Sequence, residues 1–420
     1  MKYSSSKADR TKRTKTLATK PFHFHPRDLH GLARLATHAT SEATAVVEAM
    51  HAGIAWPAVF GGDTGTGRAG GISGLIYAGV RGVTGLLSSG LDFASPLLLK
   101  GVVEPASTPE RDTWLSVLCG VIGDHLAETD NPLAIATEFR TNGQTLPLES
   151  EAMAAVLGQH TSKIVVLAHG LCGHERQWKG RSADYPEMLE SEFGFTPVFL
   201  RYNSGRHVSE NGRDLAALLE ELVANWPVPV EELVLVGHSM GGLVARSAMH
   251  FGSESEHDWV SLLTKIAFLG TPHHGAPLER GGLWIQQVLG SLPFAAPLAA
   301  LPRLRSAGIT DLRHGNVLDE DWQGQDRFES AKDSRRVLAL PESVKAIAVA
   351  ATTRRQVGRV RHRLVGDGLV PIPSALGLHD DPTRQLLRDP KAMSVVPGIH
   401  HMELLGNKAV LELLKSWMAA

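Results

Sequence analysis

A serine flanked by glycines follows a short apolar run in the middle of the chain. The segment reads Gly237-His238-Ser239-Met240-Gly241, and a helical pattern begins directly after it. A strand that turns sharply into a helix exposes a serine hydroxyl, and glycines two positions away on either side avoid steric clashes in that turn. The pattern predicts that Ser239 is a nucleophile. The N–H of Met240 would then face the oxyanion that forms during attack.

A second candidate loop follows the apolar run 164–167, and it begins His169-Gly170-Leu171-Cys172. Acyl transfer needs two backbone donors for the oxyanion, and we expect Leu171 to supply the second N–H. His169 and Gly170 are expected to support this loop, as His238, Gly237 and Gly241 support the serine turn. Cys172 has no identifiable base, so we expect a packed or loop cysteine.

A serine nucleophile needs a base at neutral pH, and the base needs an orienting carboxylate. Asp367 lies between two glycines after the apolar run 344–351, and His401 directly precedes the last helical pattern. We expect these two residues to be the acid and the base. His400 remains the alternative base. The rival acids lie in a polar stretch that resembles a surface loop: Asp380, Asp381 and Asp389.

Short apolar runs alternate with helical patterns from about residue 133 onward. The predicted strands are 163–168, 197–202, 233–237, 265–269, 344–351 and 393–396, and the predicted helices are 209–224, 242–250 and 403–418. Such alternation is typical of an α/β fold with a mostly parallel sheet flanked by helices. Asn142-Gly143 separates two further β-rich segments and predicts a tight hairpin turn.

The first third of the chain has a different texture. Residues 1–22 read as a disordered basic tail, and residues 23–132 read as a helical N-terminal extension, with helical spacing over 28–54 and 72–92. Ser107 and Glu110 are spaced as a capping box for a helix over 109–127. The remaining residues, 133–420, are expected to form the catalytic domain. Residues 275–340 interrupt its pattern and are expected to form an inserted cap or lid.

The composition excludes several classes of protein. The chain has 420 residues, 43% of them hydrophobic, and its 42 basic and 44 acidic residues give a net charge of −2. This balance argues against nucleic-acid binding, although the basic tail leaves peripheral membrane contact open. Two cysteines form no disulfide framework. No signal peptide or membrane span is recognised, so we expect a cytoplasmic or membrane-peripheral protein. The sequence does not indicate an oligomeric state.

Five ordered motifs together resemble the α/β-hydrolase superfamily. They are His169-Gly170, Gly-His-Ser239-Met-Gly-Gly, Leu269-Gly-Thr-Pro-His-His-Gly275, Gly-Asp367-Gly-Leu-Val-Pro and His401-x-x-Leu-Leu. Within it, the chain is similar to the bacterial lipase/esterase branch related to triacylglycerol lipases and GPI inositol-deacylases. The resemblance implies a Ser239–Asp367–His401 triad and hydrolysis of carboxylic esters. It also implies shaping roles for Thr271, His273 and His274.

The resulting expectation is a serine-dependent esterase or lipase that acts on ester or lipid substrates. The uncharged run 281–302 predicts an apolar lid, in which Leu283, Trp284 and Val288 would contact substrate. A thioesterase, an acyltransferase or a phospholipid deacylase would use the same triad, and a non-catalytic binding protein could keep the fold. We expect no cofactor, since the glycine pattern 65–70 follows no strand. We expect no metal either, since the adjacent histidine pairs lack metal-ligand spacing.

Overall fold

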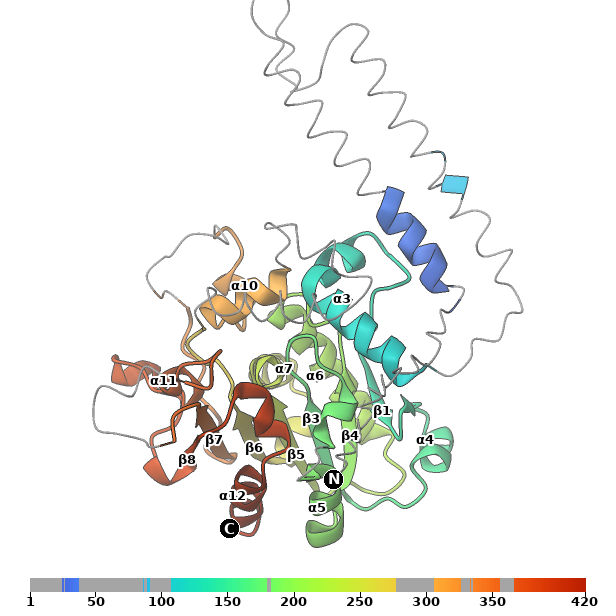
Figure 1. Cartoon of the computed structure of the whole chain (residues 1–420). Coiled ribbons are helices and arrows are strands. Elements are labelled where there is room, and N and C mark those ends of the chain that lie inside the picture. The colour runs from blue at the N-terminus through green and yellow to red at the C-terminus, as the bar shows by residue number, and fades with distance from the viewer. Residues whose placement is uncertain are drawn as a thin grey trace, which may run out of the picture.

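The computed structural model describes residues 25, 27–37, 86, 89–90, 107–179, 183–276, 306–325, 333, 335–355 and 366–420. At its centre lies an eight-stranded sheet in the order β2-β1-β4-β3-β5-β6-β7-β8 (Figure 1). The strands are β1 (Glu138–Thr141), β2 (Gln144–Thr145), β3 (Lys163–Ala168), β4 (Thr196–Arg201), β5 (Glu232–His238), β6 (Leu263–Leu269), β7 (Lys345–Thr352) and β8 (Met393–Pro397). Strands β3 to β8 run parallel, and β1 is antiparallel to both of its neighbours. The predicted mostly parallel α/β fold is confirmed.

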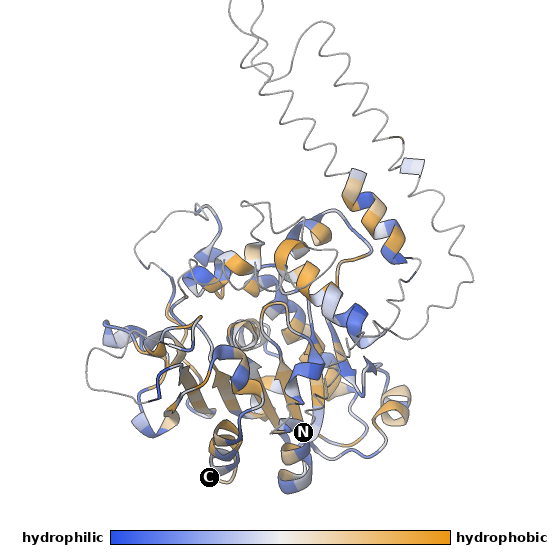
Figure 2. Ribbon diagram, viewed as in Figure 1, coloured by the Kyte–Doolittle hydropathy of each residue, from blue (hydrophilic) through white to orange (hydrophobic). Residues whose placement is uncertain are grey.

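Helices cover both faces of the sheet, as Figure 1 shows. The layer on one face contains α6 (Val208–Ala224), α7 (Met240–Glu254) and α8 (Trp259–Leu262), and the layer on the other contains α5 (Tyr185–Phe193) and α12 (Lys408–Met418). Alternate residues of each inner strand enter the two layers. Val166 and Leu235 pack with α6 and α7, whereas Val165 and Val234 pack with α5 and α12. A strand that is buried on both faces must be apolar throughout, which explains the continuous apolar runs (Figure 2).

The order of the strands places a switch point at β3. The chain passes from β3 to β4 on one side and then returns to β5 on the other, so β3 lies between them. In open α/β sheets, ligands bind beyond the carboxyl ends of the strands at such a point. The two loops that leave β3 and β5 carry the candidate nucleophile Ser239 and the candidate oxyanion donors Leu171 and Met240.

The edge of the sheet begins with the predicted hairpin. Thr141 pairs with Gln144, so Asn142 and Gly143 alone form the turn, with φ of 50° and 79°. Positive φ at both central positions matches the right-handed twist of the flanking strands. This prediction is confirmed.

The start of the first long helix differs from the prediction. Helix α3 (Pro109–Glu128) is capped by Thr108, whose hydroxyl accepts the Arg111 N–H at 3.2 Å, so the Ser107–Glu110 capping box is wrong. The Ser107 hydroxyl instead donates to Asp112 Oδ1 at 2.7 Å. Ser107 and Thr108 both carry hydroxyls, and the extended backbone at Thr108 makes Thr108 the cap of the helix.

The predicted helix over 403–418 is divided in two. A 3₁₀ segment, η6 (His401–Leu405), ends at Gly406, and α12 begins after Asn407, whose side chain accepts the Ala409 N–H at 2.8 Å. A side chain that bonds to its own following backbone favours a helix start over a helix interior. The remaining short elements are α4 (Ser150–Leu157), η1 (Glu175–Trp178), α10 (Ala307–His314), η3 (Asp319–Asp321), α11 (Ile372–Ala375), η4 (Pro382–Arg384) and η5 (Pro390–Ala392).

Some predictions fall wholly or partly outside the described residues. The tail 1–22 and the lid residues Leu283, Trp284 and Val288 lie outside them. Of the two expected N-terminal helices, only residues 27–37, 86 and 89–90 are described, and these residues are helical. The expected cap 275–340 is described as α10, η3 and the segment 335–340. None of the helices in the described part of the chain has the length and apolarity needed to cross a bilayer.

Candidate active site

Ser239 lies on a sharp turn between β5 and α7. Its φ is 53° and its ψ is −122°, a conformation that costs free energy for a residue with a side chain. Two backbone hydrogen bonds hold the turn. The Ser239 N–H donates to Leu269 O at 2.9 Å, and the Ser239 carbonyl accepts from the Gly242 N–H at 3.1 Å. The strand–turn–helix context that the sequence indicates is therefore the one that the structure has.

The glycines around Ser239 are required by close packing. A Cβ on Gly237 would lie 2.5 Å from Gly242 Cα, and a Cβ on Gly241 would lie 2.2 Å from the carbonyl oxygen of Ala168. Both contacts involve backbone atoms that cannot move aside. The start of α7 is consequently packed directly against the end of β3, which brings the two candidate loops together.

The loop after β3 reaches the serine. A Cβ on Gly170 would lie 2.9 Å from Ser239 Cβ, so this glycine stands beside the serine side chain. The loop then turns tightly, with Gly173 N–H donating to Gly170 O at 2.9 Å, and the Cys172 N–H donates to Ser204 Oγ at 3.0 Å. Within the described part of the chain, the N–H of Leu171 and the N–H of Met240 have no acceptor.

Asp367 and His401 form a buried hydrogen-bonded pair. His401 Nδ1 lies 2.7 Å from Asp367 Oδ2, and the His401 N–H donates to the Asp367 carbonyl at 3.1 Å. The other carboxylate oxygen accepts the N–H groups of Leu369 and Val370 at 3.0 and 2.8 Å. Burial disfavours the charged carboxylate, but the facing imidazole and the two backbone N–H donors outweigh burial and hold the pKa of Asp367 below its usual value.

His401 also packs against the serine turn. Its ring lies 4.8 Å, between centroids, from the ring of His238, the residue before Ser239. A Cβ on Gly270, at the end of β6, would lie 3.1 Å from His401 Cε1. The alternative base, His400, is exposed, and its backbone N–H donates to Glu403. The structure thus brings His401 to the serine turn and pairs it, not His400, with Asp367.

The rival acids lie elsewhere. Asp380, Asp381 and Asp389 are all exposed. Asp381 and Asp389 cap the short 3₁₀ segments η4 and η5 by accepting the backbone N–H groups of Thr383 and Lys391. These bonds are those of a surface loop, in agreement with the sequence-based interpretation.

The supporting histidines are buried and uncharged at neutral pH. His169 is stacked on Tyr202 at 4.3 Å, and its Nδ1 donates to the Gly170 carbonyl at 2.8 Å. Burial lowers the pKa of His169 and that of His238 to about 3. A neutral ring at position 238 does not repel a positive charge on His401. The Cys172 thiol is also buried, and burial raises its pKa, which disfavours a thiolate nucleophile.

Two residues at the end of β4 take part in this site without a sequence signal of their own. Tyr202 donates its hydroxyl to the His169 carbonyl at 2.7 Å, and the Ser204 hydroxyl accepts from Cys172. Both hold the loop after β3 in place. A tyrosine and a serine after a strand are common, so only the position of β4 beside β3 identifies them.

A cluster with metal-binding residue types lies apart from the serine turn. His274, Asp333 and His379 offer ligand atoms within 4.8 Å of one another. The Asp333 carboxylate is already bound by Arg335 and Arg384, at 2.9 and 3.3 Å. Two guanidinium groups on the one carboxylate oppose a cation at this position.

Comparisons with known proteins agree with the fold. Residues 159–346 match the family described as the PGAP1-like alpha/beta domain. No curated protein matches the sequence.

Similar solved structures include the Bacillus licheniformis lipase BlEst2 in propeptide form. It is 20% identical with a TM-score of 0.38, and the match covers 62% of this chain and 51% of that one. The chain therefore spans about half the length of that form. The mature form is 19% identical with a TM-score of 0.37, covering 61% of this chain and 91% of that one. An alpha/beta hydrolase superfamily protein from Enterococcus faecalis is 14% identical with a TM-score of 0.35, covering 61% and 90%. This chain's own sheet order is the mostly parallel arrangement of an α/β-hydrolase fold, and residues 159–346 are similar to the PGAP1-like alpha/beta domain.

Proposed function

We propose that the protein is a serine-dependent carboxylic ester hydrolase. The observation that carries the proposal is the 2.7 Å hydrogen bond between Asp367 and His401, which lies beside the strained turn of Ser239. A nucleophile, a base and an orienting acid at the switch point of one sheet are the parts that acyl transfer from an ester requires.

In the proposed reaction, Ser239 Oγ attacks the ester carbonyl while His401 Nε2 takes the hydroxyl proton of Ser239. Asp367 accepts a hydrogen bond from the Nδ1–H of His401, which keeps Nε2 free as a base and stabilises the imidazolium. The N–H groups of Leu171 and Met240, which lack acceptors in the described structure, hold the oxyanion. His401 then protonates the leaving alcohol, and water releases the acid from the acyl-enzyme by the same steps in reverse order.

The proposed substrates carry apolar acyl chains. The uncharged run 281–302, with Leu283, Trp284 and Val288, supports an apolar cover over the site. This part of the proposal predicts that hydrolysis of p-nitrophenyl esters increases from acetate to octanoate. A steady decrease over that series would contradict the apolar cover without affecting the triad.

Labelling with a fluorophosphonate tests the nucleophile directly. The probe should label the wild-type protein covalently and should leave Ser239→Ala unlabelled, because the phosphonyl group is transferred to the serine oxygen. Ser253→Ala is the matched control, since Ser253 is an exposed serine near the end of α7 and takes no part in the serine turn or in the loop after β3. Equal labelling of wild type and Ser239→Ala would rule out this nucleophile, and an unlabelled wild type would favour a non-catalytic binding protein.

The same triad serves thioesters, acyl transfer to alcohols and phospholipid deacylation. A panel with matched acyl chains, consisting of an oxygen ester, a thioester and a phospholipid, separates these reactions. We expect the oxygen ester to give the highest kcat/KM.

A further inference from the structure

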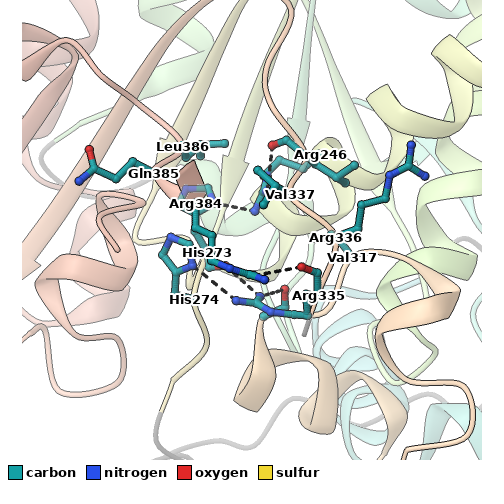
Figure 3. Close-up of a pocket in the computed structure, with 12 residues that line it drawn as sticks. Arg246, His273, His274, Val317, Arg335, Arg336, Val337, Arg384, Gln385 and Leu386 are labelled. Carbon is teal, nitrogen blue, oxygen red and sulfur yellow. Dashed lines mark hydrogen bonds between the residues drawn. The ribbon is translucent and has the colours of Figure 1, made fainter. Parts of the chain in front are cut away.

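A hollow lined by arginine and histidine side chains lies beside α7. Its walls come from α7, the loop after β6, the segment 335–338 and the loop 384–386 (Figure 3). The charged residues of the lining are all basic: Arg246, Arg335, Arg336 and Arg384, together with the histidines His273 and His274. Among the described residues, no aspartate or glutamate is part of this wall.

The acids around the hollow neutralise only part of this charge. Asp333 accepts from both Arg335 and Arg384. Arg336 lies 4.0 and 3.9 Å from two exposed glutamates, Glu254 and Glu320, which is the limit of an ion pair. Arg246 has no carboxylate within ion-pair distance among the described residues. Asp321 also attracts Arg246 and Arg335, but at longer range than an ion pair. The described lining is therefore basic, and the acids that offset its charge lie outside it.

Arg246 is the least satisfied of these cations. Its Nε is shielded from solvent and has no hydrogen-bond partner, although the side chain as a whole is half-buried. Its remaining nitrogens make long contacts of 3.4 Å, Nη1 to His273 Nδ1 and Nη2 to the Leu338 carbonyl. Burial lowers the pKa of Arg246 to about 10, which leaves it charged at neutral pH. Asp321 attracts this charge without forming an ion pair with it, so the charge of Arg246 is only partly compensated.

His273 lacks an acceptor in the same place. It is 1% exposed, and because its Nδ1 accepts from Arg246, its proton belongs on Nε2. Nε2 has no partner either. Burial and the nearby Arg246 hold the pKa of His273 well below its usual value, so the ring is a neutral N–H donor. Two buried donors thus lack acceptors, and a ligand made only of acceptors would satisfy both.

We propose that this hollow binds a phosphate group. Phosphate presents several acceptor oxygens and suits guanidinium groups, which bind it through paired N–H bonds. The guanidinium groups of Arg246, Arg335 and Arg384, which all line the hollow, would bind it and neutralise its charge. The group is either free phosphate or the headgroup of an anionic phospholipid. The site is separate from the proposed triad, so it does not depend on the proposed function.

Titration with inorganic phosphate tests the site. Calorimetry at constant ionic strength, with chloride replaced by phosphate, should show saturable binding by the wild type and equally by Ser239→Ala. Arg246→Gln should weaken binding at least about tenfold because it removes a charge-assisted donor. Arg246→Lys, which keeps the charge but not the planar donor set, should lie between the two. The matched control is Arg388→Gln, an exposed arginine of the same loop as Arg384 that is outside the lining, and it should bind as the wild type does.

Flotation with vesicles identifies the source of the phosphate group. Vesicles of phosphatidylcholine with added phosphatidic acid should retain the wild type but not Arg246→Gln if the ligand is a lipid headgroup. If only inorganic phosphate binds, the free ion is the ligand. Cooperative urea unfolding establishes that each variant is folded, and Arg384→Gln replaces Arg246→Gln if the latter is not. Binding that persists in the folded variants, absence of binding in both assays, or binding of Zn²⁺ with none of phosphate overturns the proposal.

Discussion

Asp367 binds His401 twice, once through its carboxylate and once through its carbonyl. The side-chain bond to Nδ1 is 2.7 Å long, and the backbone bond from the His401 N–H is 3.1 Å long. Together they fix the position and the orientation of the imidazole without any help from solvent, since Asp367 is 1% exposed and His401 is 4% exposed. The carboxylate therefore selects which imidazole nitrogen faces the serine turn.

Replacing the carboxylate by an amide should remove activity while the fold stays intact. Asp367→Asn can keep the backbone bond to His401, but its amide can donate to Nδ1 and so place the imidazole proton on Nε2. If the protein has the proposed triad, we expect kcat for a p-nitrophenyl ester to fall by about 10³- to 10⁴-fold with a small change in KM. A kcat within tenfold of wild type would contradict the role of Asp367 as the orienting acid.

The same carboxylate should make stability depend on pH. The pKa of Asp367 is lower in the folded protein than in the unfolded chain, so its charge stabilises the fold above the unfolded pKa of about 3.9. This contribution disappears as the pH falls through the lower, folded pKa. Urea unfolding should show a larger free-energy difference between wild type and Asp367→Asn at pH 6 than at pH 3. A difference that is constant with pH would show that the carboxylate charge does not contribute.

Local patterns were sufficient to predict much of the fold and the proposed triad. The bounds of β3 agree with the prediction at both ends, and Ser239 lies on the predicted strand-to-helix turn. Both features depend on the sequence within a few residues, because burial on two faces demands a continuous apolar run and the turn demands small neighbours. The break in the last predicted helix, at Gly406, also has a local cause, but the apolar periodicity of the sequence continues across it and hides the break.

Contacts between distant segments could not be predicted in this way. Arg246 and His273 belong to different elements, and their contact depends on how the loop after β6 packs against α7. Tyr202 and Ser204 hold the loop after β3 only because β4 pairs with β3. A single sequence carries no signal for such pairs, since each residue has an ordinary type in an ordinary place.

The two adjacent histidines should differ sharply in function. His401 is buried against Asp367, whereas His400 is exposed and contributes its backbone N–H to Glu403. We expect His401→Gln to reduce kcat by at least about 10³-fold, as loss of a triad member does, and His400→Gln to keep kcat within a factor of about three. The measurement is steady-state hydrolysis of one p-nitrophenyl ester. The reverse pattern would move the base to His400.

Helix α3 should contribute to the stability of the central sheet. Its Asp112 forms a fully buried ion pair of 2.7 Å with Arg201 of β4. Asp112→Asn removes the carboxylate that pairs with the buried guanidinium of Arg201, so we expect a loss of about 3–5 kcal/mol in the free energy of urea unfolding. Glu192→Gln breaks the exposed pair with Lys415 and should cost far less. Equal losses in the two variants would show that the pair does not hold α3 to the sheet.

The absence of a side chain at Gly270, just after β6, should be needed to keep the His401 ring in position. Gly270 has a φ of 63°, and a Cβ there would lie 2.7 Å from Leu404 Cδ1 and 3.1 Å from His401 Cε1. Gly270→Ala should therefore lose about 1–2 kcal/mol to the left-handed backbone and lower kcat as well by displacing the imidazole. Gly194→Ala is the matched control, because Gly194 has a φ of 70° and open space where the Cβ would be. It should lose similar stability to the backbone but keep its kcat, whereas unchanged kcat in both variants would show that Gly270 does not position the base.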